Sequence, residues 1–90
     1  MVFGGTPIIH RFAVTTSIFD QAGNIVSRPQ KLFRLSGEAH DYAKAQRELH
    51  TRTGVISLIE VTRIEDNQVM AEYKSKKLQS EQRKAKGRKR

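Results

Sequence analysis

The strongest strand signal in this chain is the run Val-Ile-Ser-Leu-Ile-Glu-Val-Thr-Arg-Ile at residues 55–64. β-Branched residues dominate the run, and such residues favour extended backbone. Its apolar side chains occupy both alternation faces: Val55, Ile59 and Val61 on one, Ile56, Leu58 and Ile64 on the other. A strand that is apolar on both faces has to be buried on both. The run therefore predicts a central strand in a sheet whose two faces are both covered.

Two further strands are predicted upstream of this run. Residues 8–19 are rich in β-branched and aromatic types, and their apolar residues recur with period two. The turn-forming residues at 20–24 then lead into a second extended run at residues 25–35. Pro29 lies inside that run and cannot donate a ladder hydrogen bond, so we expect this strand at an edge of the sheet.

A helix is predicted between the second and third strands, at about residues 37–52. Ser36 is the expected N-cap and Gly54 the expected C-cap. The side chains expected on its buried stripe follow helical spacing: Ala39, Tyr42, Ala43, Gln46 and Leu49. After the central run, a turn at 65–68 leads into a fourth strand at 69–74, which gives the order ββαββ.

These elements predict an α+β fold with an antiparallel four-stranded sheet and one helix. One right-handed crossover helix makes strands 2 and 3 parallel and leaves room for strand 1 between them, so the expected strand order is 2-1-3-4. One helix covers only one face of the sheet. We expect a second copy of the protein to cover the other face, which makes the protein a homodimer.

Charge divides the chain into two regions. The full sequence has 17 Lys and Arg against 9 Asp and Glu. Residues 74–90 hold nine of these cations and one anion, Glu81, which leaves eight of each sign, a balance of zero, for residues 1–73. The expected organisation is a flexible lead at 1–7, a compact domain at 8–73 and a basic tail at 74–90. Only Leu78 and Ala85 are apolar in the tail, so we expect it to be largely disordered.

The basic tail predicts a nucleic acid as partner. A Lys or Arg placed near a phosphate releases a condensed counterion and adds affinity that falls steeply with salt. The candidate binding residues are Lys74, Lys76, Lys77, Arg83, Lys84, Lys86, Arg88, Lys89 and Arg90. In second rank are Arg11, Arg28 and Arg34, which share one face if the strand registers are unbroken, and Phe19, which could stack on a base.

Other chemistries find no support in the residue pattern. His10, His40 and His50 include no closely spaced pair, which is how a metal site is usually assembled. The sequence has no nucleophile motif and no phosphate-cradling glycine loop, so we expect no enzyme activity, cofactor or metal. It has no cysteine and no apolar run of membrane-spanning length or export leader. A cytoplasmic protein without a membrane partner is expected.

Three functions remain open. The first is a small, dimeric, non-enzymatic accessory protein that binds nucleic acid, with DNA and RNA equally possible. The second is a protein-binding inhibitor or adaptor of the kind encoded by phages and other mobile elements, which would engage a host or complex protein through an exposed sheet face or edge. The third is a structural component of a ribosome-like ribonucleoprotein, whose tail threads between RNA helices.

Overall fold

The structure is a computed structural model that describes residues 10–87, with side chains described up to residue 81. It confirms an α+β fold with an antiparallel sheet and one main helix. The elements in chain order are β1 (Phe12–Phe19), β2 (Ile25–Ser27), β3 (Gln30–Phe33), α1 (Ser36–Thr53), β4 (Ile56–Arg63), β5 (Gln68–Lys74) and α2 (Lys76–Gly87). The lead predicted at residues 1–7 lies outside the described residues.

The sheet has five strands, not the predicted four. Its order is β2-β1-β4-β5, and β3 also pairs with β1. The predicted second strand is therefore two short strands that follow each other along one edge of β1, which changes the predicted order 2-1-3-4 only at that edge. Pro29 separates them because it has no N–H to donate, although its carbonyl still accepts from the Thr16 N–H at 2.9 Å. The pairs Ile18–Ser27 and Thr15–Gln30 keep one register, so the break does not shift the strands.

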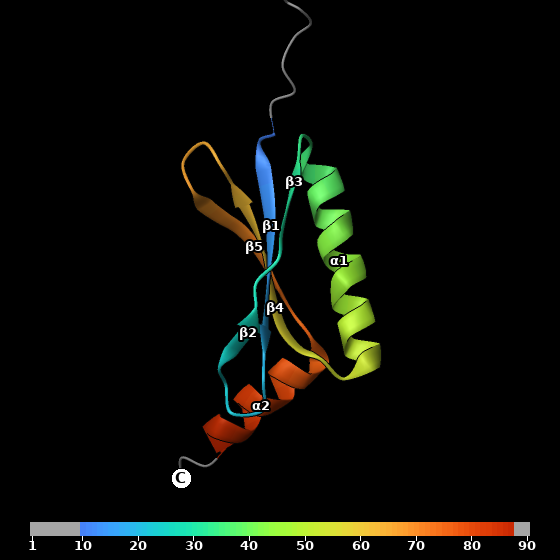
Figure 1. Cartoon of the computed structure of the whole chain (residues 1–90), viewed down its shortest axis with the longest axis vertical. Helices are drawn as coiled ribbons and strands as arrows, with labels where there is room; N and C mark the ends of the chain where they lie inside the picture. The colour runs from blue at the N-terminus through green and yellow to red at the C-terminus, as the bar shows by residue number, and fades with distance from the viewer. Residues whose placement is uncertain (1–9, 88–90) are drawn as a thin grey trace, which may run out of the picture.

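Helix α1 lies along one face of the sheet (Figure 1). The core lies between them, where Val14, Ile59 and Val61 of the sheet meet Ala39 and Ala43 of the helix. All five are almost completely buried. Alanine on the helix allows its backbone to approach the branched side chains of the central strands closely, which favours dense packing.

The ends of α1 agree in part with the sequence prediction. Gly54 has φ 75° and caps the C-terminus in the left-handed region, as predicted. The predicted N-cap was wrong: Ser36 is the first helical residue, and Leu35 occupies the cap position without a side-chain bond.

The buried stripe of α1 ends on His50 instead of the predicted Leu49. Leu49 is 41% exposed, whereas His50 is buried and its Nδ1 lies 2.8 Å from the Ser57 Oγ. His50 follows Ala43 by seven residues and Ala39 by eleven, which are two and three helical turns. Hydrophobicity favoured leucine, but the helical period set by the two buried alanines, together with the hydroxyl on β4, places the histidine against the sheet.

In the basic segment, the structure has helix α2 at Lys76–Gly87; whether the segment is largely disordered in free solution, as predicted, is not tested by this and stays a prediction. Figure 1 shows α2 crossing the end of the sheet at which α1 finishes. Side chains beyond residue 81 and all of residues 88–90 lie outside the described part, so their predicted disorder stays a prediction. Between residues 10 and 87, no helix is long and apolar enough to span a membrane.

Candidate nucleic-acid interface

A single serine joins the basic helix to the sheet. Ser75 is fully buried, and its Oγ donates to the Val55 carbonyl at 2.7 Å. The same oxygen accepts from the Ser57 N–H at 3.1 Å and from the Leu78 N–H at 3.3 Å. Ser75 thus acts as the N-cap of α2 and also pairs with the start of β4. This network fixes the direction in which the basic segment leaves the body.

The first turn of α2 is held from the α1 side as well. The Lys76 N–H donates to the Thr51 Oγ1 at 3.1 Å, and the Gln79 N–H donates to the Ser75 carbonyl at 3.0 Å. The Gln79 side-chain amide donates to the Lys74 carbonyl at 2.9 Å. Three elements, α1, β5 and α2, therefore meet at one hydrogen-bonded junction.

A hollow of about 460 Å³ lies at this junction, and we call it the junction groove. It is lined by Arg47, Glu48, Thr51, Arg52, Lys74, Lys76 and Gln79. Four of these side chains are cationic and one is anionic, which gives a formal charge of 4 − 1 = +3. The Arg47 guanidinium lies 5.8 Å from the centre of the Tyr73 ring, within range of a cation–π contact.

Two of the four cations of the junction groove were missed by the sequence reasoning, which counted Arg47 and Arg52 only as part of a neutral body. The topology contained the missing signal. Antiparallel pairing places Lys74 opposite Leu58 near the start of β4, and β4 begins directly after α1. The last turns of a helix that precedes β4 therefore have to lie beside the beginning of the basic segment.

The first-rank residues predicted from the sequence fall into three groups. Lys74 and Lys76 line the junction groove, and Lys77 is exposed on the first turn of α2. Arg83, Lys84 and Lys86 belong to α2 by backbone assignment, but their side chains are not described. Arg88, Lys89 and Arg90 lie outside the described residues.

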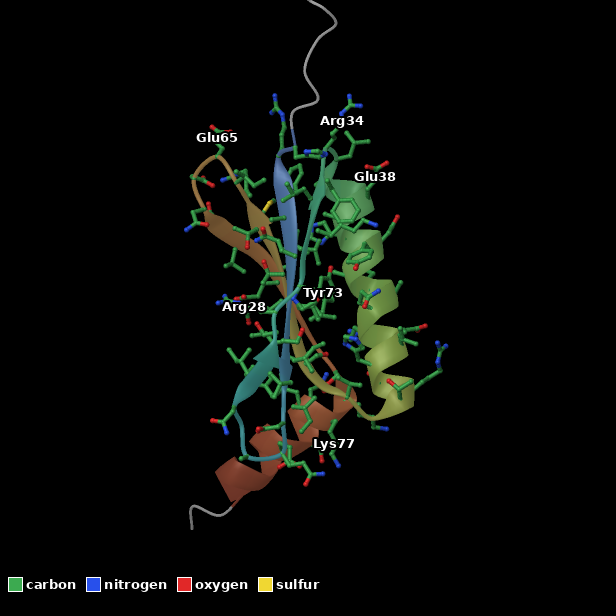
Figure 2. The ribbon with its side chains drawn as sticks, viewed as in Figure 1. Arg28, Arg34, Glu38, Glu65, Tyr73 and Lys77 are labelled. Carbon is green, nitrogen blue, oxygen red and sulfur yellow. The ribbon has the colours of Figure 1, made fainter. Side chains whose placement is uncertain are left out.

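The second-rank residues do not meet as one group, although Arg11 and Arg34 lie at the same end of the sheet, next to the Phe12–Phe33 pair of β1 and β3. Arg11 precedes β1 and Phe19 ends it, a separation of eight residues or about 26 Å along an extended strand. Figure 2 shows Arg34 near Glu38 at the start of α1, while Arg28 lies at mid-length of the sheet and Lys77 at its other end. The second-rank residues therefore do not form one basic surface. They are Arg11, Phe19, Arg28 and Arg34.

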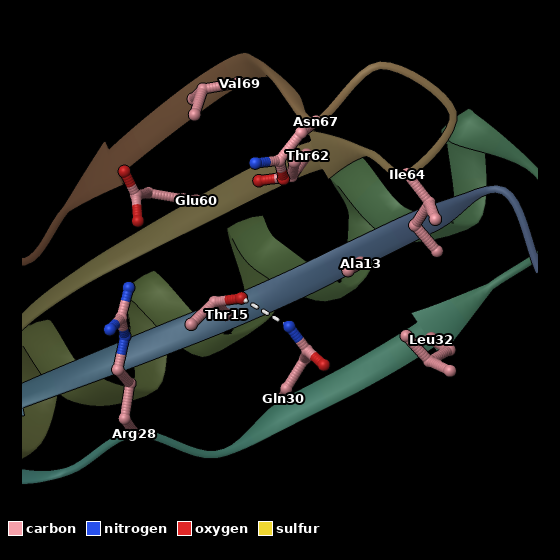
Figure 3. A pocket seen from close by; sticks show the side chains of 10 residues that line it. All are labelled: Ala13, Thr15, Arg28, Gln30, Leu32, Glu60, Thr62, Ile64, Asn67 and Val69. Atoms are coloured by element: carbon pink, nitrogen blue, oxygen red, sulfur yellow. Dashed lines mark hydrogen bonds between the residues drawn. The ribbon is translucent and has the colours of Figure 1, made fainter.

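Arg28 instead faces a second hollow, of about 630 Å³, on the sheet face opposite α1 (Figure 3). We call it the sheet-face hollow. Its lining residues are Ala13, Thr15, Arg28, Gln30, Leu32, Glu60, Thr62, Ile64, Asn67 and Val69. A hydrogen bond from the Gln30 amide to the Thr15 hydroxyl, 3.1 Å long, crosses its floor. Glu60 is directly opposite Glu72 in the β4–β5 register, so this face carries acidic groups as well as Arg28.

Two of the three histidines, His40 and His50, have structural partners. His40 Nδ1 lies 2.9 Å from the Tyr73 hydroxyl, and His50 is bonded to Ser57. Burial lowers the pKa of His50, because a charged imidazolium would lose its hydration there. Within the described part of the chain, no group of three His, Asp or Glu side chains could hold a metal ion.

An exposed ion pair lies in the turn between β4 and β5, beside the end of the sheet-face hollow that Ile64 and Asn67 line. Arg63 and Asp66 are 2.7 Å apart, and Arg63 also donates to the Gln68 side chain. This pair lowers the pKa of Asp66 and raises that of Arg63. It orders the turn between β4 and β5 and adds little to stability, because exposed pairs are screened by water and salt.

No family model, curated protein or solved structure matches this chain, so its geometry and charge carry the functional argument.

Proposed function

We propose that this protein is a small non-enzymatic nucleic-acid-binding protein that contacts phosphates through its basic C-terminal segment. The observation that carries the proposal is the placement of charge: nine of 17 cations follow residue 73, at the point where the Ser75 network anchors the segment to the body. A surface of one sign attracts a polyanion over distance, and a fixed origin gives the attraction a direction.

The test uses the full chain with its distal cations neutralised. In this arm variant, Arg83, Lys84, Lys86, Arg88, Lys89 and Arg90 are all replaced by Gln. The substitutions remove six charges but keep Ser75 and the first turn of α2. Binding to duplex DNA, single-stranded DNA and structured RNA is then titrated with salt. If five cations of the unaltered chain reach phosphates, its log–log slope on duplex DNA is about −4 to −5.

We expect the arm variant to bind every substrate more weakly and with a shallower slope. The matched control replaces Arg11, Arg28, Arg34, Lys31, Lys44 and Arg63 by Gln, which removes the same number of charges from the body. A control that loses as much affinity as the arm variant would contradict the proposal. Absence of binding by the unaltered chain at low salt would favour the protein-binding inhibitor or adaptor.

The alternative of a protein partner is favoured by one observation, the apolar side chains left exposed on the sheet face opposite α1. Leu32, Ile64 and Val69 are each 43–45% exposed there. Association through such a surface depends little on salt, in contrast to phosphate binding. A ribonucleoprotein component would show the salt dependence on structured RNA alone.

For this sheet face we propose a second copy of the chain as occupant. Figure 3 shows Arg28 and Glu60 at one end of the hollow, on opposite sides of β1, and Leu32 and Ile64 at the other end in the same arrangement. A two-fold axis parallel to β1, in front of this sheet face, would bring Arg28 of each copy close to Glu60 of the other. The same axis would place Leu32 on Ile64, so the face complements itself in charge and in apolarity.

The dimer is tested by exchanging its charges. Sedimentation at several protein concentrations should show weaker association for Arg28→Glu, because like charges then meet across the axis. The double variant Arg28→Glu with Glu60→Arg should recover the association. A sedimentation profile that is monomeric for the unaltered chain at micromolar concentration would remove the dimer.

A further inference from the structure

We propose that the junction groove binds a phosphate group of the nucleic-acid backbone and so fixes the register of the bound strand on the body. The inference rests on the proposed function and extends it, because it assigns a defined site to residues outside the basic tail. The groove carries a formal charge of +3 in a hollow of about 460 Å³, a volume that easily holds a phosphate and its first water molecules. Its cations come from three different elements, so the fold itself assembles them.

Arg47 is the best positioned cation in the groove. Its side chain lies over Tyr73, and the Tyr73 hydroxyl is in turn held by His40 at 2.9 Å. The ring contact restricts the long arginine side chain before any ligand arrives, which lowers the entropic cost of binding. A guanidinium also presents a planar fork of donors that matches two phosphate oxygens.

The lysines of the groove are placed by backbone contacts. The Lys76 backbone is bonded to Thr51, and the Lys74 carbonyl is bonded to the Gln79 side chain. The N-terminus of α2 contributes a partial positive charge, but the C-terminus of α1 contributes a partial negative charge of similar size at the same place. The two helix dipoles offset each other, so the four formal cations determine the sign of the site.

The continuation of the groove into α2 favours a nucleic acid over an acidic peptide. Helix α2 runs from the groove for 12 residues, about 18 Å, and adds Lys77 at its start and further basic residues along its sequence. A nucleic acid offers a regular series of phosphates over that length. A peptide would need acidic side chains arranged to match it. Glu48 is the opposing charge in the groove, and it would repel a ligand that approached along its side.

The experiment compares two double variants of the full chain. The groove variant carries Arg47→Gln and Arg52→Gln, and the matched control carries Arg11→Gln and Arg34→Gln, which removes two arginines at the end of the sheet away from the junction. Both are titrated with short duplex DNA and with an RNA hairpin over a range of salt concentrations. The groove variant should bind more weakly, and its log–log slope on duplex DNA should be shallower by about 1.8, or two phosphate contacts. The control should keep the slope of the unaltered chain.

A second measurement reports on the site directly. Backbone amide shifts of the unaltered chain are followed by NMR during titration with the same oligonucleotides and, separately, with inorganic phosphate at constant ionic strength. We expect oligonucleotide-dependent shifts at residues 47–52 and 74–79 that the groove variant loses. Saturation of these shifts by inorganic phosphate alone would overturn the nucleic-acid assignment in favour of a free-anion site.

The outcomes separate this inference from the proposed function. If the arm variant loses binding while the groove variant matches its control, the groove proposal is wrong and the proposed function stands. If the groove variant loses binding while the arm variant keeps it, the groove proposal stands and the basic tail is not the main binding segment. Loss of solubility or of helical signal in the groove variant is resolved by Arg47→Lys with Arg52→Lys, which keeps the charge and should retain the salt slope.

Discussion

Different interactions hold the body of this protein and its basic segment in place. Residues 10–73 are ordered by burial: a few branched side chains of β1 and β4 pack on two alanines of α1, and the formal charges of this region cancel. The first turn of α2 buries little apart from Ser75, and hydrogen bonds to the body place it. Apolar packing therefore maintains one region, whereas polar contacts position the other, so substitutions in the two regions should have separate effects.

The largest loss of stability is expected from a substitution that creates a cavity in the core of the body. Ile59 is fully buried between α1 and the sheet, so Ile59→Ala should lower the free energy of unfolding by about 2–5 kcal/mol. Val69→Ala, at a position 43% exposed, is the control and should cost less than about 1 kcal/mol. Urea denaturation measures both. Equal losses at the two positions would show that the core is not where the structure places it.

A smaller loss in the free energy of unfolding is expected from a substitution at the junction between the body and the basic segment. Ser75→Ala leaves the Ser57 N–H and the Val55 carbonyl without their buried partner, at a cost of about 1–3 kcal/mol. The exposed Ser80→Ala, on the same helix, should change the free energy of unfolding by less than about 0.5 kcal/mol. Amide exchange should also show earlier loss of protection in α2 than in β4 for Ser75→Ala. Unchanged protection of α2 would mean that the serine does not anchor it.

A pH-dependent effect is expected from His50, and its sign follows from the lowered pKa. The unfolded chain takes up a proton on this imidazole near its ordinary pKa of about 6.5, before the folded chain does. The free energy of unfolding should therefore be highest above pH 6.5 and fall as the pH decreases towards the folded pKa. One whole unit of pKa shift corresponds to about 1.4 kcal/mol, which sets the scale. Thermal unfolding of His50→Gln should lack this component, whereas a slope equal to that of the unaltered chain would assign it to another group.

The smallest effect on stability is expected from the arm variant, although its effect on binding is the largest proposed. Neutralising six cations beyond residue 81 removes no described contact of the body. The free energy of unfolding should change by less than about 0.5 kcal/mol, with a slight gain where like charges no longer repel each other. A loss of several kcal/mol in urea would show that the distal segment packs on the body, and would end the separation of the two regions.

Much of the fold followed from local patterns. The two-sided apolar run at 55–64 and the period of two at 8–19 predicted the two central strands, since burial of alternate side chains is a local property of an extended chain. Pro29 did not by itself predict that the second strand is split into two. Whether a proline bends, bulges or merely interrupts a strand depends on the neighbouring strand. Hydrophobicity alone could not predict that His50 is buried and Leu49 exposed. A buried histidine requires a hydrogen-bond partner, and the linear sequence does not identify that partner.

The sequence by itself was enough to predict the division of charge and an α+β fold with an antiparallel sheet and one main helix, because net charge and periodicity are sums over neighbouring residues. Only the tertiary structure decided that Arg47 and Arg52 lie beside Lys74 and Lys76. These residues are more than 20 positions apart, and they meet because antiparallel pairing returns the end of β5 to the start of β4. A surface composed from distant segments depends on chain topology and register, which composition does not contain.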